Sequence, residues 1–284
     1  MDKVTQIYSI SSPFDVELSG EGLCCAIVDG AFDDNLQGQI YRNANNGSPI
    51  WMSLTLNTPY ADLGKQSPCL VRCAEHPGLM RYTSELLAQS NAGCVVWLEQ
   101  DSDWPLAVRH CQSLLAVMDE RHSRSFFRFF EPRWLEPLFS VLSAKERLDF
   151  LGPFRAMSWR NELGWRHIAR LESWTGKIQE PGWFHMNALR QQQLEEARLS
   201  LVAVLLADSY RSHLPESEPE HVVLAQLQKA RAAGYTALAE QERWLRLYLS
   251  RPPGFLDSVL AQQTLSRKDI ARGEKLSELE KLNA

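Results

Sequence analysis

The sequence predicts an α/β (α+β) N-terminal lobe with a mixed sheet, followed by an all-helical C-terminal lobe. Over residues 1–180, short apolar runs typical of buried strands alternate with amphipathic helical patterns. Strand patterns stop near residues 180–182, where the chain reads Glu-Pro-Gly, and helical periodicity takes over. A chain of 284 residues also exceeds the size at which a single hydrophobic core usually stops growing. We therefore expect two domains, residues 1–180 and residues 181–284.

The predicted strands of the N-terminal lobe are short runs of apolar and β-branched residues that end at glycine, proline or polar turns. They lie at residues 24–28, 51–56, 69–73, 93–98, 126–130, 155–160 and 165–171. The last two are joined by residues 161–164, which end in a glycine and form a hairpin signal. This hairpin would supply the antiparallel part of the mixed sheet.

Helices are predicted wherever apolar residues recur every three or four positions. In the N-terminal lobe these patterns lie at residues 36–40, 79–86, 104–118 and 134–142. In the C-terminal lobe they lie at residues 187–211, 222–233, 236–249, 255–265 and 267–282. Asp103 suits the N-cap position of the helix that follows it, and Gly234 suits the C-cap of the helix that it ends.

The stretch from Ser125 to Trp134 is dense in aromatic residues and stops at Pro132. Phe126–Phe130 is too short for a helix and rich in strand-favouring side chains, so it is predicted to be a buried strand. Pro132 is suited to the first position of a helix, where its missing N–H is not needed. Glu131 and Arg133 would then lie at the rim, where polar groups converge in α/β folds. The simpler alternative is a core strand followed by two solvated charges.

Composition excludes several classes of protein. With 44% hydrophobic and 23% charged residues, the chain has the composition of an ordinary soluble globular protein. No signal-peptide pattern opens it, and the apolar stretch at residues 199–207 is far shorter than the ~20 residues that span a bilayer. We expect a cytoplasmic protein without membrane insertion.

The cysteines offer one spacing that resembles a metal site, formed by Cys69, Cys73 and His76. On a strand, side chains four residues apart share a face but lie too far apart to chelate easily. No second pair follows at zinc-finger spacing. We therefore expect no metal and no cofactor. His110 and His167 fall in predicted elements, where a hydrogen-bonded structural histidine is the simpler interpretation.

Two further chemistries remain as alternatives. Asp29, Asp33 and Asp34 could supply a carboxylate pair that acts with Arg128 and Arg133 on a phosphorylated substrate. Strand-end and capping roles explain the three aspartates without any chemistry. Residues 121–170 hold ten basic and five acidic residues, which would suit weak nucleic-acid binding. No nucleic-acid-binding motif accompanies this excess, and solvated faces explain it more simply. We expect no nucleic acid as a partner.

Four short motifs resemble those of a known family. Residues 127–133 (Phe-Arg-Phe-Phe-Glu-Pro-Arg) are similar to its Phe-Arg-Phe-Tyr-Asp-Pro-Arg motif. Residues 28–31 (Val-Asp-Gly-Ala) end the opening strand, residues 68–71 are similar to Pro-x-Leu-Val, and residues 151–153 are similar to Phe-Gly-Pro. The chain thus resembles, over about residues 24–160, the adaptor or chaperone proteins (Tap or Tec) that load toxic effectors onto the spike of the bacterial type VI secretion system. Its Phe130-Glu131 pair replaces the Tyr-Asp pair of the family motif.

The resemblance implies a non-enzymatic cytoplasmic adaptor with no catalytic residues. Such a protein binds a cognate type VI effector and passes it to a spike-tip protein before export. Tryptophan and arginine are enriched at binding hot spots, and the chain has nine tryptophans, most of which we expect in the core. The candidate partner-binding or architectural residues are Arg128, Glu131, Arg133, Trp134 and Trp244. Enzymatic and nucleic-acid-binding functions stay open as alternatives.

Overall fold

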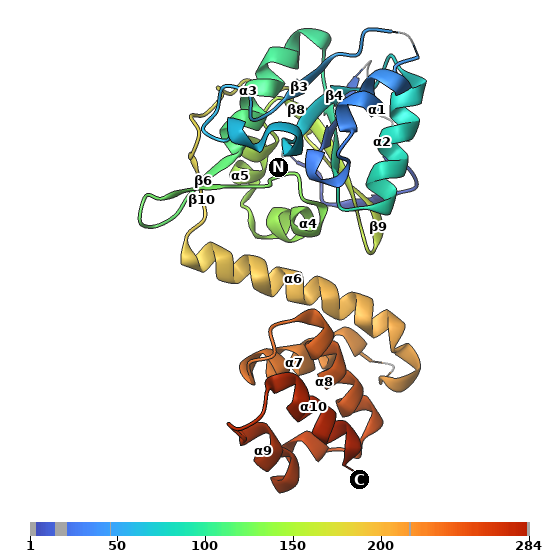
Figure 1. The fold of residues 1–284 in the computed structure, drawn as a ribbon, viewed down its shortest axis with the longest axis vertical. Coiled ribbons are helices and arrows are strands. Elements are labelled where there is room, and N and C mark those ends of the chain that lie inside the picture. The colour runs from blue at the N-terminus through green and yellow to red at the C-terminus, as the bar shows by residue number, and fades with distance from the viewer. Residues whose placement is uncertain (1–3, 15–21, 46, 216, 283–284) are drawn as a thin grey trace. The chain divides into compact units, whose positions relative to one another are not determined.

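The computed structural model describes residues 4–14, 22–45, 47–215 and 217–282. The chain divides into two compact units, Met1–Glu195 and Glu196–Ala284. The sequence placed a boundary at residue 180, whereas the compact units divide within the long helix α6 (Ala188–Ser209). Figure 1 shows a sheet with its covering helices in the first unit and helices alone in the second.

The first unit is built around a seven-stranded sheet. Its strand order is β1-β9-β8-β5-β2-β4-β3, and every neighbouring pair is antiparallel. The strands are β1 (Tyr8–Ile10), β2 (Leu23–Val28), β3 (Trp51–Ser53), β4 (Cys69–Arg72), β5 (Gly93–Leu98), β8 (Phe154–Asn161) and β9 (Gly164–Ala169). The central strands β2 and β5 are buried along their whole length, which explains why they read as continuous apolar runs.

Helices cover both faces of this sheet (Figure 1). On one face, α1 (Leu36–Asn43) and α2 (Pro77–Gln89) pack in a cluster with Cys24, Ala26 and Val28 of β2. On the other face, Cys25 and Ile27 pack in a cluster to which three further helices contribute. Those helices are α3 (Trp104–Leu114), α4 (Pro132–Val141) and α5 (Ala144–Leu151). Alternate residues of one strand thus serve two separate cores.

A second, three-stranded sheet has the order β10-β6-β7. It consists of β6 (Ala116–Met118), β7 (Arg124–Phe126) and β10 (Phe184–His185), with β10 parallel and β7 antiparallel to β6. The predicted fold class is confirmed, with one correction of detail: the large sheet is antiparallel throughout, and the mixed sheet is the small one. Strands β1 and β10 were not predicted, because one is an exposed three-residue edge strand and the other has only two residues. The helix predicted at residues 104–118 is wrong beyond residue 114, because α3 ends there and residues 116–118 form β6.

The predicted strand at Phe126–Phe130 is wrong beyond its first residue. Only Phe126 belongs to β7, and the amide of Phe127 makes one further bond, to the Leu115 carbonyl at 2.8 Å. Phe129 and Phe130 lie in a turn, each only 1% exposed. These two positions are aromatic because they are buried in the core, and not because they pair in a strand. A buried strand and a buried turn favour the same side chains, so the sequence does not distinguish them. Pro132 begins α4, as predicted.

The described residues of the second unit form helices and the segments that connect them, and no strand. Besides the C-terminal part of α6 it contains α7 (Pro219–Ala232), α8 (Leu238–Ser250), α9 (Val259–Ser266) and α10 (Arg272–Lys281). Gly234 follows α7 with a φ of +92°, the left-handed conformation predicted for a glycine C-cap. Among the described residues of the whole chain, no helix is long and apolar enough to cross a membrane.

Two buried histidines lie in the core of the first unit. His110 is 2% exposed, and its Nε2 lies 2.8 Å from the Phe150 carbonyl. His167 is fully buried, and its Nδ1 lies 2.8 Å from the hydroxyl of Ser158. Burial disfavours the charged imidazolium and lowers the pKa of each ring to about 4.

We expect the stability of the first unit to fall as the pH falls from 7 towards 4.5. Between pH values of about 6.5 and 4 the unfolded chain binds a proton at His110 that the folded chain does not bind, so unfolding is favoured. The contribution of His110 between pH 7 and 5 is up to about 2 kcal/mol. Urea unfolding at pH 7 and at pH 5 measures this loss of stability. His110→Gln should reduce the pH dependence, whereas the exposed control His185→Gln should leave it unchanged.

Candidate partner-binding groove

The end of strand β2 positions a buried carboxylate. Asp29 follows Val28 and is 3% exposed, and its Oδ1 accepts a hydrogen bond from the amide of Ala31 at 2.9 Å. This bond caps the short 3₁₀ helix η1 (Gly30–Phe32). A Cβ on Gly30 would lie only 2.3 Å from the Lys65 carbonyl oxygen. In the Val-Asp-Gly-Ala motif, Asp29 thus caps η1, and Gly30 lets the backbone pass close to that of Lys65.

Gly30→Ala is expected to destabilise the protein by about 1–3 kcal/mol, because the added methyl group collides with backbone atoms that cannot rotate away. Thermal unfolding followed by circular dichroism measures the loss. Gly273→Ala is the control, since a Cβ there meets nothing within 4 Å. Equal melting temperatures for the Gly30 variant and the wild type would contradict the tight contact.

The turn before α4 places a second buried carboxylate between two arginines. Glu131, at the N-cap of α4, is 4% exposed. Its Oε2 lies 3.2 Å from an Nη of Arg128, and its Oε1 accepts a hydrogen bond from Arg133 Nε at 2.8 Å. The same Arg128 nitrogen forms an ion pair with Asp29. We call these four residues (Asp29, Arg128, Glu131 and Arg133) the ion-pair chain.

The ion-pair chain is balanced, with two carboxylates and two guanidinium groups. Burial raises the pKa of Asp29, while the Ala31 amide and the Arg128 charge oppose this rise. The hydrogen bond to Glu131 raises the pKa of Arg133. Arg128 also lies 5.9 Å from the ring centres of both Phe32 and Phe130. The ion-pair chain therefore connects the end of β2 to the start of α4.

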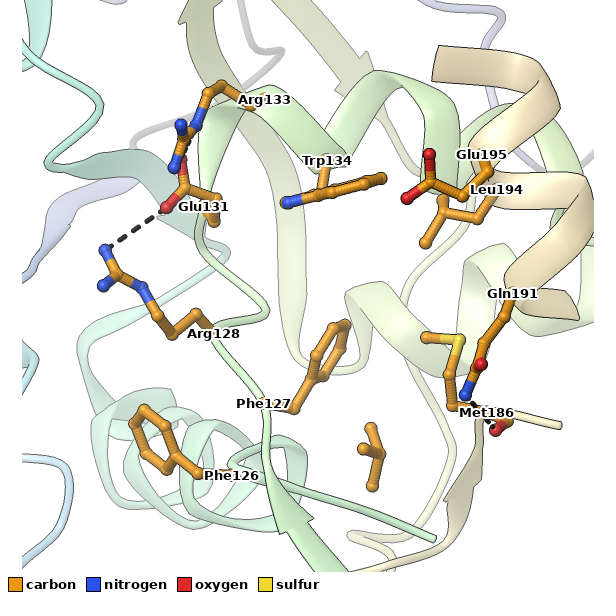
Figure 2. Close-up of a pocket in the computed structure, with 11 residues that line it drawn as sticks. Phe126, Phe127, Arg128, Glu131, Arg133, Trp134, Met186, Gln191, Leu194 and Glu195 are labelled. Carbon is orange, nitrogen blue, oxygen red and sulfur yellow. Dashed lines mark hydrogen bonds and ion pairs between the residues drawn. The ribbon is translucent and has the colours of Figure 1, made fainter. Parts of the chain in front are cut away.

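Beside this chain lies a groove of about 570 Å³. Its apolar lining residues are Val117, Phe126, Phe127, Trp134, Met186 and Leu194, and its polar ones are Arg128, Glu131, Arg133, Gln191 and Glu195. Figure 2 shows Phe127, Trp134 and Leu194 around a common space, with the two arginines and Glu131 at one end. The first turns of α6 are fixed there in part by a hydrogen bond from Gln191 Nε2 to the Met186 carbonyl at 3.2 Å. All lining residues belong to the first unit.

The structure brings together four of the five candidate site residues. Arg128, Glu131, Arg133 and Trp134 all line the groove. Glu131 is buried as the centre of the ion-pair chain, so it does not lie at an exposed rim. Trp244 lies in the second unit, 5% exposed, and its ring packs 5.8 Å from that of Tyr235.

Sequence reasoning missed the far wall of the groove. Met186, Gln191 and Leu194 follow the turn at 131 by more than fifty positions, and no local motif marks them. They meet Phe127 because β10 pairs with β6, and such a non-local pairing leaves no trace in a single sequence.

The alternative acidic cluster does not assemble. Asp29 joins Arg128, but Asp33 accepts hydrogen bonds from the Tyr82 hydroxyl and the Asn35 amide instead. Asp34 is exposed. In the described parts of the chain, neither Asp33 nor Asp34 forms an ion pair with an arginine.

The cysteine spacing places two buried thiols on and after β4. Burial raises the pKa of both Cys69 and Cys73 to about 12, which disfavours the thiolate that zinc binding needs. No group of three or more metal-ligating side chains occurs within the described ranges.

Residues 24–149 match a family model described as "Domain of unknown function (DUF4123)". This family is associated with effector adaptors of the type VI secretion system. The matched region runs from β2 into α5 and includes the whole ion-pair chain. Searches of curated proteins and of solved structures found no match.

Proposed function

We propose that this protein is a cytoplasmic, non-enzymatic adaptor that binds one type VI effector and passes it to a spike-tip protein. One observation carries the proposal: the region that matches the adaptor-associated family also contains the ion-pair chain and most of the residues that line the groove. A protein that binds a partner needs an accessible surface held by a packed fold. In the first unit the groove is such a surface, and the sheet with its helices holds it.

The groove has the chemistry of a protein-binding site. Trp134 is half-buried, and the side chain of Arg133 is 51% exposed although it is anchored to Glu131. An anchored arginine retains donors for a carbonyl or carboxylate of a partner, and loses little conformational freedom on binding. Aromatic and arginine side chains of this kind dominate the affinity of protein interfaces. We infer that an apolar segment of the effector lies against Phe127, Trp134 and Leu194.

The two alternatives find less support in the geometry. An enzyme would need Asp29 to reach its substrate, but Asp29 is buried and does not line the groove. Nucleic-acid binding would need unpaired positive charge over residues 121–170. There, Arg128, Arg133, Arg166 and Arg170 each pair with a carboxylate. If the protein turns over a substrate and Asp29→Asn abolishes this turnover, the enzymatic function is favoured. If the protein binds DNA with an affinity that falls steeply as salt rises, nucleic-acid binding is favoured.

Affinity purification of the tagged protein from its native bacterium, under conditions of active secretion, tests the proposal. We expect mass spectrometry to identify a toxic effector and a spike-tip protein of the secretion system. Recovery of neither, from cells shown to express the secretion genes, would refute the adaptor function. A tagged chain with Arg133→Glu and Trp134→Ala is the matched control and should recover less effector.

A further inference from the structure

The second unit contains a separate pocket of about 460 Å³ formed by residues of α7, α8, α9 and α10 and the segments between them. Two aromatic side chains form its buried wall, Tyr235 at 1% exposure and Trp244 at 5%. The indole N–H of Trp244 is buried and has no hydrogen-bond partner in the described part of the chain. A buried donor without a partner is energetically unfavourable in the folded state.

The rim of this pocket carries an excess of positive charge. Lys229, Arg272 and Lys275 line it with a single carboxylate, that of Asp257. Asp257 lies 4.0 Å from Lys229, and both side chains are more than half exposed. Across residues 217–282, neither Arg272 nor Lys275 forms an ion pair with a carboxylate. The charge of the pocket therefore favours an anion.

Both remaining cations are held in place by backbone carbonyls. Arg272 donates from an Nη to the Gly234 carbonyl at 2.6 Å, and Lys275 donates from Nζ to the Leu265 carbonyl at 2.8 Å. Each bond uses one donor, so an arginine with five donors and a lysine with three retain several. The two residues are three positions apart on α10 and therefore share a face of that helix. The start of α10 adds the positive end of the helix dipole.

We propose that this pocket binds an acidic segment of a protein partner. A glutamate or aspartate side chain pairs with Arg272 and Lys275, and a neighbouring apolar side chain packs against Tyr235 and Trp244. The choice of a peptide rests on the proposed adaptor function, and the choice of an acidic one rests on the charges of the pocket. The second unit thus supplies a contact that is independent of the groove in the first.

Fluorescence anisotropy of the full-length protein with a labelled hexapeptide of alternating leucine and glutamate tests this site. We expect saturable binding, which weakens at least about tenfold in Arg272→Ala/Lys275→Ala and falls as salt rises. The matched control Arg231→Ala/Lys268→Ala removes the same charges from exposed positions outside the pocket and should change affinity less than about twofold.

A second measurement needs no variant protein. The peptide with glutamine in place of glutamate should bind wild-type protein at least about tenfold more weakly, since it lacks the carboxylate. Equal binding of the two peptides, an unchanged affinity in the pocket variant, or no saturable binding at all would overturn the inference. If the protein recovers its effector from cells but does not bind the acidic peptide, this inference alone fails. If peptide binding holds but no effector or spike-tip protein is recovered, the adaptor function fails.

Discussion

Arg128→Ala is expected to lower the free energy of unfolding of the first unit by about 2–3 kcal/mol, less than for a fully buried ion pair because the Arg128 side chain is 39% exposed. The side chain pairs with Asp29 and Glu131, which are 3% and 4% exposed. Its removal leaves Asp29 without an ion-pair partner and the two buried carboxylates without the cation that lies between them. Urea unfolding at pH 7.5 measures the loss.

Arg133→Ala is the matched control for this prediction. Arg133 pairs with the same Glu131 but is half exposed, and Glu131 keeps Arg128 as a partner. We expect a loss of about 1 kcal/mol or less. The defect of Arg128→Ala should also shrink as the pH falls towards 5, because an unpaired buried carboxylate can then take up a proton. Equal losses for the two variants would show that the buried carboxylates do not depend on Arg128.

Trp134→Ala is expected to weaken binding of the recovered effector by about 30-fold, which corresponds to about 2 kcal/mol. Trp134 lines the groove opposite Leu194 and is the largest apolar side chain there (Figure 2). Isothermal titration calorimetry with purified effector measures the change. The melting temperature must be followed in parallel, so that loss of binding is not confused with loss of fold.

Trp51→Ala is the control for this second prediction. Trp51 is also half-buried, but it lies on the edge strand β3 and packs against Tyr41, outside the groove. It should leave effector affinity within about twofold of wild type. If Trp134→Ala binds as tightly as wild type, the groove is not the effector site, whatever the protein binds elsewhere.

Local signals in the sequence predicted local features of the fold. Gly93–Leu98 has the length and the apolar content of a buried strand and is β5 with those bounds. Pro132 begins a helix because of its fixed φ and missing N–H, and Gly234 ends one because of its positive φ. A further signal was overlooked: Ser143 and Glu146 form a capping box that begins α5, a helix that the sequence analysis did not predict.

Features that depend on distant pairs could not be predicted. The alternation of strands and helices is compatible with several strand orders, and only tertiary packing selects the antiparallel one. The turn at Phe129-Phe130 was mistaken for a strand because a buried turn and a buried strand select the same side chains. At the site, sequence motifs identified Arg128 to Trp134, but the pairing with Asp29 and the wall at Leu194 arise from the fold alone.

Site-specific photocross-linking tests the central claim most directly. A benzoylphenylalanine at Gln191, an exposed position that lines the groove, is compared in secreting cells with one at Gln37, exposed on α1 outside it. We predict a cross-link from position 191 to one effector and none from position 37. Cross-links of equal yield from both positions, or none from position 191 while the effector still co-purifies, would contradict binding in the groove.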